Sequence, residues 1–206
     1  MKRCRASALF FALLLSLSAC GGGNSPALSG SSPGDVSQET VQPPKVLPFT
    51  LAFYPEYSLH PTLAGNRTNL TLTPLLYESL FTVDTSFQAQ PLLCGSYTVS
   101  EDKLVWTLNL RPGITFSDGT PLTGQAAADA LNLARAPGSR YRERLAGVAA
   151  ITAQDESPNQ LVITLGRPNG SLPLLLDIPI ALGNGERPVG TGPYVLSEDG
   201  LFLTAR

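Results

Sequence analysis

The connection between residues 111 and 124 restricts the possible folds of this chain more than any other stretch. It reads "RPGITFSDGTPLTG", with three glycines, two prolines and an Asp-Gly pair. The preceding "KLVWTLNLR" alternates apolar and polar residues, which is the period of a half-buried strand. The following "TGQAAADALNLARA" has strong helix propensity, with Thr123 as a predicted cap and Ala136-Pro137-Gly138 as a stop. Strand, prescribed turn and helix in this order predict a mixed α+β fold.

Other segments supply the rest of the expected sheet. "SYTVS" should pair with "KLVWTLNLR" as an antiparallel hairpin, and "VAAITAQ" with "QLVITLG" as a second pair. We expect "VLPFTLAFY" (residues 46–54) to be a buried strand that begins the sheet, and "ITF" (114–116) to be a short strand. Trp106 shares a face with three leucines, so its predicted place is the core, with ligand stacking as the alternative. The overall expectation is the α/β class, with a mixed sheet, antiparallel hairpins and short helices.

The short helices are expected beside these strands. Thr73 followed by Pro74 predicts an N-cap and a first helical residue, which would open a helix through "PLLYESLF". "YRERLAGV" predicts a helical turn, and "SLPLLLDIPIAL" an apolar helix or loop. The last stretch, "GNGERPVGTGPYVLSEDGLFLTAR" (183–206), is expected to end in two short strands around Glu198-Asp199-Gly200.

The N-terminus has the layout of a lipoprotein export signal. Three basic residues precede an apolar run and then Leu17-Ser18-Ala19-Cys20, and the run is shorter than a membrane-spanning helix needs. The last four residues resemble the lipobox of bacterial lipoproteins, in which the cysteine carries the lipid. We therefore expect a signal peptide over residues 1–19, lipid attachment at Cys20 and an extracytoplasmic protein anchored to the cell membrane. The alternative is an ordinary signal peptide with an incidental cysteine.

Composition separates a tether from a folded part. Residues 20–47 are rich in Gly, Ser and Pro with few aliphatic residues, which predicts a disordered tether before a folded region over residues 48–206. The whole chain has 206 residues and a formal net charge of −2, so it lacks the basic surface that nucleic-acid partners require. Cys94 lies in the apolar stretch "PLLCGSY", which favours a small buried residue over a reactive thiol.

Several motifs, in this order, resemble one family. They are "SLHP" (58–61), "LLYESLFTVD" (75–84), the long run from Pro91 to Thr123, "LVITL" (161–165) and "GTGPYVL" (190–196). Together they resemble the N-terminal part of the family 5 solute-binding proteins of ABC transporters, the oligopeptide, dipeptide and nickel binding lipoproteins. The resemblance implies part of a periplasmic-binding-protein-like lobe, with the chain stopping before the second lobe. It implies ABC permease and ATPase subunits as partners, a peptide or other small solute, a membrane contact through the lipid anchor and no cofactor.

The resemblance also implies a ligand-contacting loop after "SLHP". The corresponding residues are Arg67, Thr68 and Asn69, and the alternative is a polar surface loop. His60 stands where the family commonly has a turn-forming aspartate, and a lone histidine offers no metal cage. No catalytic motif is present, so we expect no enzyme activity and no metal site. Two functions remain open: the solute-binding component of an importer, or a shortened, non-binding lipoprotein that acts as an interaction module.

Overall fold

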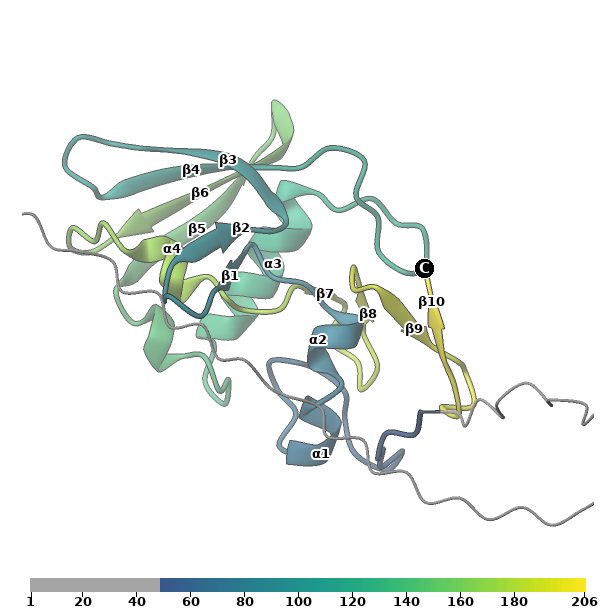
Figure 1. Ribbon diagram of the computed structural model, residues 1–206. Coiled ribbons are helices and arrows are strands. Elements are labelled where there is room, and N and C mark those ends of the chain that lie inside the picture. Colours follow the sequence, from purple (N-terminus) through teal and green to yellow (C-terminus); the bar gives the residue numbers. More distant parts are fainter. Residues whose placement is uncertain (1–48) are drawn as a thin grey trace, which may run out of the picture. The chain divides into compact units, whose positions relative to one another are not determined.

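A four-stranded antiparallel sheet forms the centre of the computed structural model, which describes residues 49–206 (Figure 1). The strand order is β3-β4-β6-β5. Its members are β3 (Cys94–Val99), β4 (Val105–Leu110), β5 (Val148–Gln154) and β6 (Ser157–Leu165). Both predicted hairpins are confirmed: Thr98 lies opposite Thr107, and Thr152 opposite Val162. The expected signal peptide, Cys20 and the tether lie outside the described residues.

The helix α3 (Gly124–Arg135) covers one face of this sheet (Figure 1). Thr123 caps it as predicted, because its hydroxyl accepts a hydrogen bond from the Ala126 backbone N–H at 3.2 Å. The helix approaches β6 so closely that a side chain at Gly124 would collide with the backbone of Gln160. Small residues therefore suit this interface, and four of the five alanines of α3 are buried.

The larger hydrophobic cluster lies between the sheet and α3. Trp106 is 3% exposed and belongs to it, which confirms its predicted core position. Within the connection 111–124, Phe116 is fully buried. In the turn that follows, Gly119 takes a positive φ of 86° and Asp118 accepts from the Thr120 N–H at 2.9 Å. The turn chemistry is thus as predicted, but "ITF" is not a strand. Only a single bridge joins Thr115 and Pro121 there.

A second, smaller hydrophobic cluster joins residues from the start of the described chain with residues near its C-terminus. Its buried members are Leu59, Leu72, Leu76, Tyr77 and Ala181. The remaining elements surround the two clusters. They are α1 (Arg67–Leu70), α2 (Thr73–Leu76), β1 (Phe81–Val83), β2 (Ala89–Pro91), the 3₁₀ turn η1 (Glu143–Leu145), α4 (Leu172–Leu175), β7 (Ala181–Leu182), β8 (Val189–Gly190), β9 (Tyr194–Leu196) and β10 (Leu203–Ala205).

The expectation of a strand at the start of the folded part is wrong for its described portion. Residues 49–54 form no strand, and Phe49 is 88% exposed. An alternating segment becomes a strand only beside a partner strand, and no described strand pairs with it. Phe53 instead packs half-buried against the smaller cluster.

Two other predictions concern the helix α2 and the two C-terminal strands. The helix begins at Thr73 itself, and Leu72 before it makes no side-chain cap bond, so Thr73 as N-cap is wrong by one position. The helix also ends at Leu76, so its predicted continuation through "PLLYESLF" is wrong, and Phe81 begins β1 instead. β9 and β10 form the predicted hairpin around Glu198-Asp199-Gly200, with Val195 opposite Thr204.

Candidate functional site

The "SLHP" turn is built around the histidine ring. Nδ1 of His60 accepts a hydrogen bond from the Thr62 backbone N–H at 3.2 Å, and the backbone N–H of His60 donates to the Ser58 hydroxyl at 3.0 Å. The ring thus does what an aspartate carboxylate does in an Asx turn. Burial lowers the pKa of His60, and the Gly183 carbonyl and the Glu186 charge only partly oppose that shift.

Asn69 holds the segment before this turn in place. Its Oδ1 accepts from the Tyr54 N–H at 2.9 Å, and its Nδ2 donates to the carbonyls of Tyr54 at 2.9 Å and Tyr57 at 3.0 Å. A weaker contact of 3.4 Å joins Nδ2 to the Ser58 carbonyl. Asn69 is 1% exposed, so it is a buried brace whose side-chain groups are occupied within the protein.

Two loops far apart in the sequence meet at Glu186. Its carbonyl accepts from the Leu59 N–H at 2.8 Å and from the Ser58 hydroxyl at 3.2 Å. A hollow of about 590 Å³ opens between these loops. It is lined by Pro55, Glu56, Tyr57, Ser58, Leu63, Ala64, Gly65, Asn66, Glu186 and Arg187. We call this the 56–186 hollow.

The wall of the 56–186 hollow carries charged side chains of both signs and the aromatic side chain of Tyr57. Glu56 and Glu186 are exposed carboxylates. Arg187 donates to the Glu198 carbonyl at 3.2 Å, and its guanidinium lies 5.6 Å from the centre of the Phe53 ring. Such a surface suits a solute that carries both an ammonium and a carboxylate group.

The structure places the predicted ligand residues beside this hollow. Arg67 is exposed and Thr68 half-buried on α1, directly after the lining residue Asn66. Asn69 faces inward as described. Sequence reasoning did not select Glu56, Glu186 or Arg187, since about 130 residues separate the two loops and no pattern links them.

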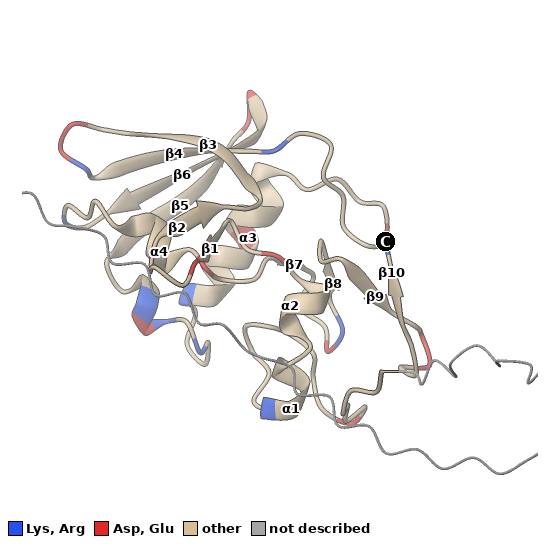
Figure 2. Ribbon diagram, in the orientation of Figure 1, with Lys and Arg blue, Asp and Glu red and all other residues tan. Residues whose placement is uncertain are grey.

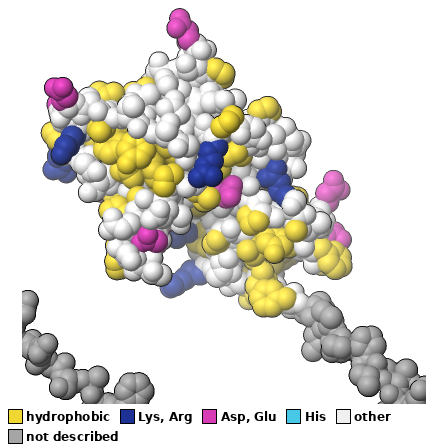
Figure 3. Space-filling model, turned by 45° about the horizontal axis from the view of Figure 1, so that its top comes forward, with side chains coloured by type: hydrophobic (Ala, Val, Ile, Leu, Met, Phe, Trp, Pro, Cys, Tyr) yellow, Lys and Arg dark blue, Asp and Glu magenta, His cyan; other side chains and the backbone are white. Residues whose placement is uncertain are grey.

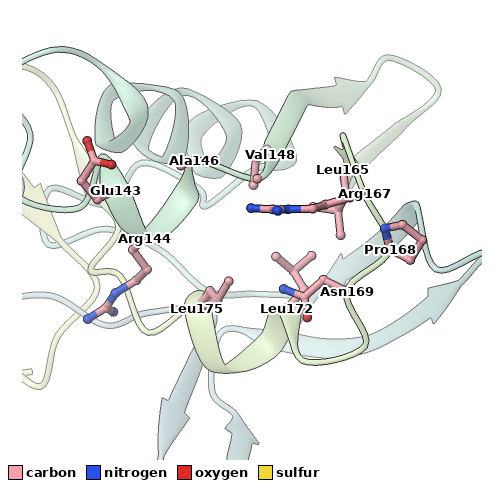
Figure 4. A pocket seen from close by; sticks show the side chains of 11 residues that line it. Glu143, Arg144, Ala146, Val148, Leu165, Arg167, Pro168, Asn169, Leu172 and Leu175 are labelled. Carbon is pink, nitrogen blue, oxygen red and sulfur yellow. The ribbon is translucent and has the colours of Figure 1, made fainter.

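A second hollow, of about 250 Å³, lies beside η1 and α4 (Figure 4). Arg144 and Arg167 both line it. Arg144 is engaged structurally, because it donates to the Asp177 carbonyl at 2.8 Å and lies 5.2 Å from the centre of the Tyr141 ring. Arg167 is exposed. This hollow therefore lacks a buried polar group that would orient a ligand.

Charges and reactive groups elsewhere are dispersed. Figure 2 shows acidic and basic residues interspersed over turns and helix ends. Within residues 49–206 no three His, Cys, Asp or Glu side chains gather as metal ligands would, and no helix has the length and apolar character of a membrane span. Cys94 is fully buried as predicted, and burial raises the pKa of its thiol to about 11, so it stays protonated.

Comparison with known proteins decides the family. Residues 88–200, more than half of the chain, match the model of the bacterial extracellular solute-binding proteins, family 5. The chain belongs to this family. The glutathione-binding protein GsiB of Escherichia coli O1:K1 is 32% identical over 153 residues, which cover 68% of this chain and 30% of that protein. The chain thus spans less than a third of the length of this curated family 5 relative.

Solved family 5 structures share the fold. The protein MoaA of Agrobacterium tumefaciens R10, solved with mannopinic acid, is 28% identical with a TM-score of 0.60, over 67% of this chain and 32% of MoaA. The oligopeptide-binding protein AppA of Bacillus subtilis, solved with a nonapeptide, also has a TM-score of 0.60 at 16% identity, over 73% of this chain and 34% of AppA. These matches confirm the predicted α/β, periplasmic-binding-protein-like fold. The relatives in both comparisons are solute-binding proteins rather than enzymes.

Proposed function

We propose that this family 5 chain supplies part of the solute-binding surface of an ABC importer for peptide-like solutes. The observation that carries the proposal is the 56–186 hollow, whose lining residue Asn66 directly precedes the predicted ligand residues 67–69. Its wall is rigid, since Asn69 braces residues 54–58 and Glu186 ties both loops together. A pre-formed wall lowers the entropic cost of binding. Permease and ATPase subunits are the proposed partners, and Cys20 is the proposed lipid anchor on the extracytoplasmic side.

The hollow's charges suggest how a peptide would lie. Glu56 and Glu186 suit its ammonium end, and Arg187 suits a carboxylate. Arg67, on the adjoining helix α1, is a further proposed contact. The name of GsiB makes glutathione, a tripeptide with one ammonium and two carboxylates, the first solute to test.

Isothermal titration of the chain with glutathione, and then with a mixed di- to pentapeptide library, tests the proposal. We expect saturable binding that Glu56→Gln weakens about threefold to tenfold, as expected for loss of one charged contact. Glu101→Gln, an exposed carboxylate in the β3–β4 turn, is the matched control and should bind like the parent. A folded protein that binds no peptide in the library contradicts the proposal.

A second candidate function is that of a non-binding interaction module. Exposed apolar side chains favour it: Leu201 is 72% and Phe202 68% exposed, next to the two-stranded β9–β10 hairpin. Figure 3 shows hydrophobic side chains reaching the surface in more than one area. Such patches are typical of protein contacts. Absence of peptide binding together with self-association would favour this function.

A further inference from the structure

The sequence contains two Asn-Gly pairs, and the structure places them in different surroundings. They are Asn169–Gly170 and Asn184–Gly185. Asparagine is a chemically labile residue, and a following glycine favours its deamidation. Glycine has no side chain to hinder attack of its backbone nitrogen on the asparagine amide, and its backbone adopts many conformations. Because both pairs share this chemistry, their surroundings decide which of them reacts.

The first pair is held in a turn. The Oδ1 atom of Asn169 accepts a hydrogen bond from the Ser171 backbone N–H at 2.8 Å, and the Asn169 N–H donates to the Lys103 carbonyl at 3.4 Å. The residue is half-buried. A side-chain bond to the backbone two residues further on fixes the side chain of asparagine. The Asn169 amide must give up this bond before the Gly170 nitrogen can attack it.

The second pair lies without such restraints in the loop between β7 and β8 (Figure 1). Asn184 and Gly185 are both exposed. Among the hydrogen bonds of residues 49–206, none involves the Asn184 side chain or the Gly185 N–H. A side chain at Gly185 would meet no atom within 4 Å, so the space around the attacking nitrogen is open.

We infer that Asn184 is a site of spontaneous deamidation. The backbone nitrogen of Gly185 loses its proton to hydroxide and forms a bond to Cγ of Asn184, and the amide nitrogen takes a proton from water and leaves as ammonia. Water then opens the resulting five-membered imide at either of its carbonyls. The products are aspartate and isoaspartate, in which the main chain runs through the former side chain. Both products replace a neutral amide with a carboxylate.

The isoaspartate product alters the loop that anchors the 56–186 hollow. It adds one atom to the backbone, and Glu186 follows two residues later. The Glu186 carbonyl holds the opposite loop through the Leu59 N–H at 2.8 Å and the Ser58 hydroxyl at 3.2 Å. Isoaspartate therefore loosens this anchor, whereas aspartate keeps the backbone spacing and adds only charge. The consequence for peptide binding rests on the proposed function, but the modification does not.

Mass spectrometry of peptides from the full chain, incubated at mildly alkaline pH, tests the modification. We expect most of Asn184 to be converted while most of Asn169 remains an amide, and an isoaspartate-specific methyltransferase identifies the isoaspartate. In concentrated urea both pairs lose their surroundings, so their rates should approach each other. No conversion at Asn184 in the folded protein, or an equal rate at Asn169, overturns the inference. A rate difference that persists unchanged in urea also overturns it, because structure would then not be its cause.

Two glycine variants provide the matched comparison. Gly185→Ala hinders the attack at a position where a side chain meets nothing, so the folded protein should lose most of its conversion at Asn184. Gly170→Ala, where a side chain makes only an ordinary contact with Lys103, should leave that conversion unchanged. Equal conversion of Asn184 in both variants contradicts the inference.

Hydrogen exchange of the Leu59 backbone amide tests the loosened anchor, because this amide donates to the Glu186 carbonyl. We expect faster exchange in the isoaspartate form of the parent than in the variant Asn184→Asp, which carries the same charge on an unaltered backbone. Equal exchange in these two proteins contradicts the loosening. A chain that fails to bind glutathione contradicts the proposed function and neither of these two results.

Discussion

Single side chains fix the turn that supports the candidate sites. His60 and Asn69 are both nearly fully buried, and both hydrogen-bond backbone groups of residues 54–62, His60 through Nδ1 and Asn69 through both groups of its side-chain amide. Either side chain appears in the sequence as an ordinary polar residue of a loop. Their role follows from burial, because a buried backbone N–H or C=O requires a partner.

The buried imidazole predicts a fall in stability with acid. The pKa of His60 is lower in the folded protein than its usual 6.5 because of burial, so the unfolded chain binds the proton more tightly. The stabilisation is present above pH 6.5 and is lost as the pH falls from there through the folded-state pKa. Urea unfolding at pH 7.5 and 5.0 should show the lower midpoint at pH 5.0.

His60→Asp provides the comparison for this titration. The unperturbed pKa of an aspartate is about 3.9, well below the window in which the imidazole titrates. The variant carboxylate still accepts from the Thr62 N–H, which favours its charged form. The variant should therefore lose less stability between pH 7.5 and 5.0 than the parent. An equal loss of stability in both proteins would mean that groups other than His60 cause the dependence of stability on pH.

Between elements, the "GTGPY" motif is explained by a close approach. A side chain at Gly190 or Gly192 would collide with the backbone of Leu76 at the end of α2. The Gly192 N–H also donates to the Leu76 carbonyl at 3.0 Å, and the Gly190 carbonyl accepts from the Ser117 N–H at 2.9 Å. The motif therefore joins α2 to the turn before α3.

Gly192→Ala should lower the free energy of unfolding by about 1–3 kcal/mol, the usual cost of forcing atoms into a packed interface. Gly185→Ala is the matched control, because a side chain there meets nothing within 4 Å. Chemical denaturation of both variants measures the difference. Equal stabilities would mean that the contact between α2 and the segment at Gly192 adjusts to the added methyl group without a loss of stability.

Local patterns predicted the elements whose evidence is local. The two hairpins and α3 follow from period and capping, and each is confirmed at its expected place. Residues 49–54 have the alternating pattern of a strand, but no described strand pairs with them. The pattern alone therefore predicted a strand that the structure does not have there. The 56–186 hollow could not be predicted from the sequence for a related reason, because it depends on a long-range hydrogen bond to the Glu186 carbonyl.

Across the described chain, the two hydrophobic clusters differ in how well they are covered. The larger one lies between the sheet and α3. Leu196 of β9 and Leu203 of β10 pack only partly buried against the smaller one, and the turn between these two strands exposes Leu201 and Phe202. The β9–β10 hairpin beside it forms a sheet of only two strands. Exposed apolar residues next to open strand edges favour association with another chain.

The double variant Leu201→Ser, Phe202→Ser should reduce self-association of the chain at high concentration. Sedimentation velocity over a concentration series measures this. Phe87→Ser is the control, because Phe87 is 79% exposed in the β1–β2 turn, away from β9 and β10. A parent protein that stays monomeric throughout contradicts the expectation.

The position of Trp106 determines what optical experiments on this protein can report. It is the only tryptophan of the chain and lies within the larger cluster, with its ring 5.4 Å from that of Tyr97. The 56–186 hollow is formed by loops around the smaller cluster. Tryptophan fluorescence, excited selectively, will therefore follow the opening of the four-stranded sheet closely, while a solute can fill that hollow without altering the tryptophan emission.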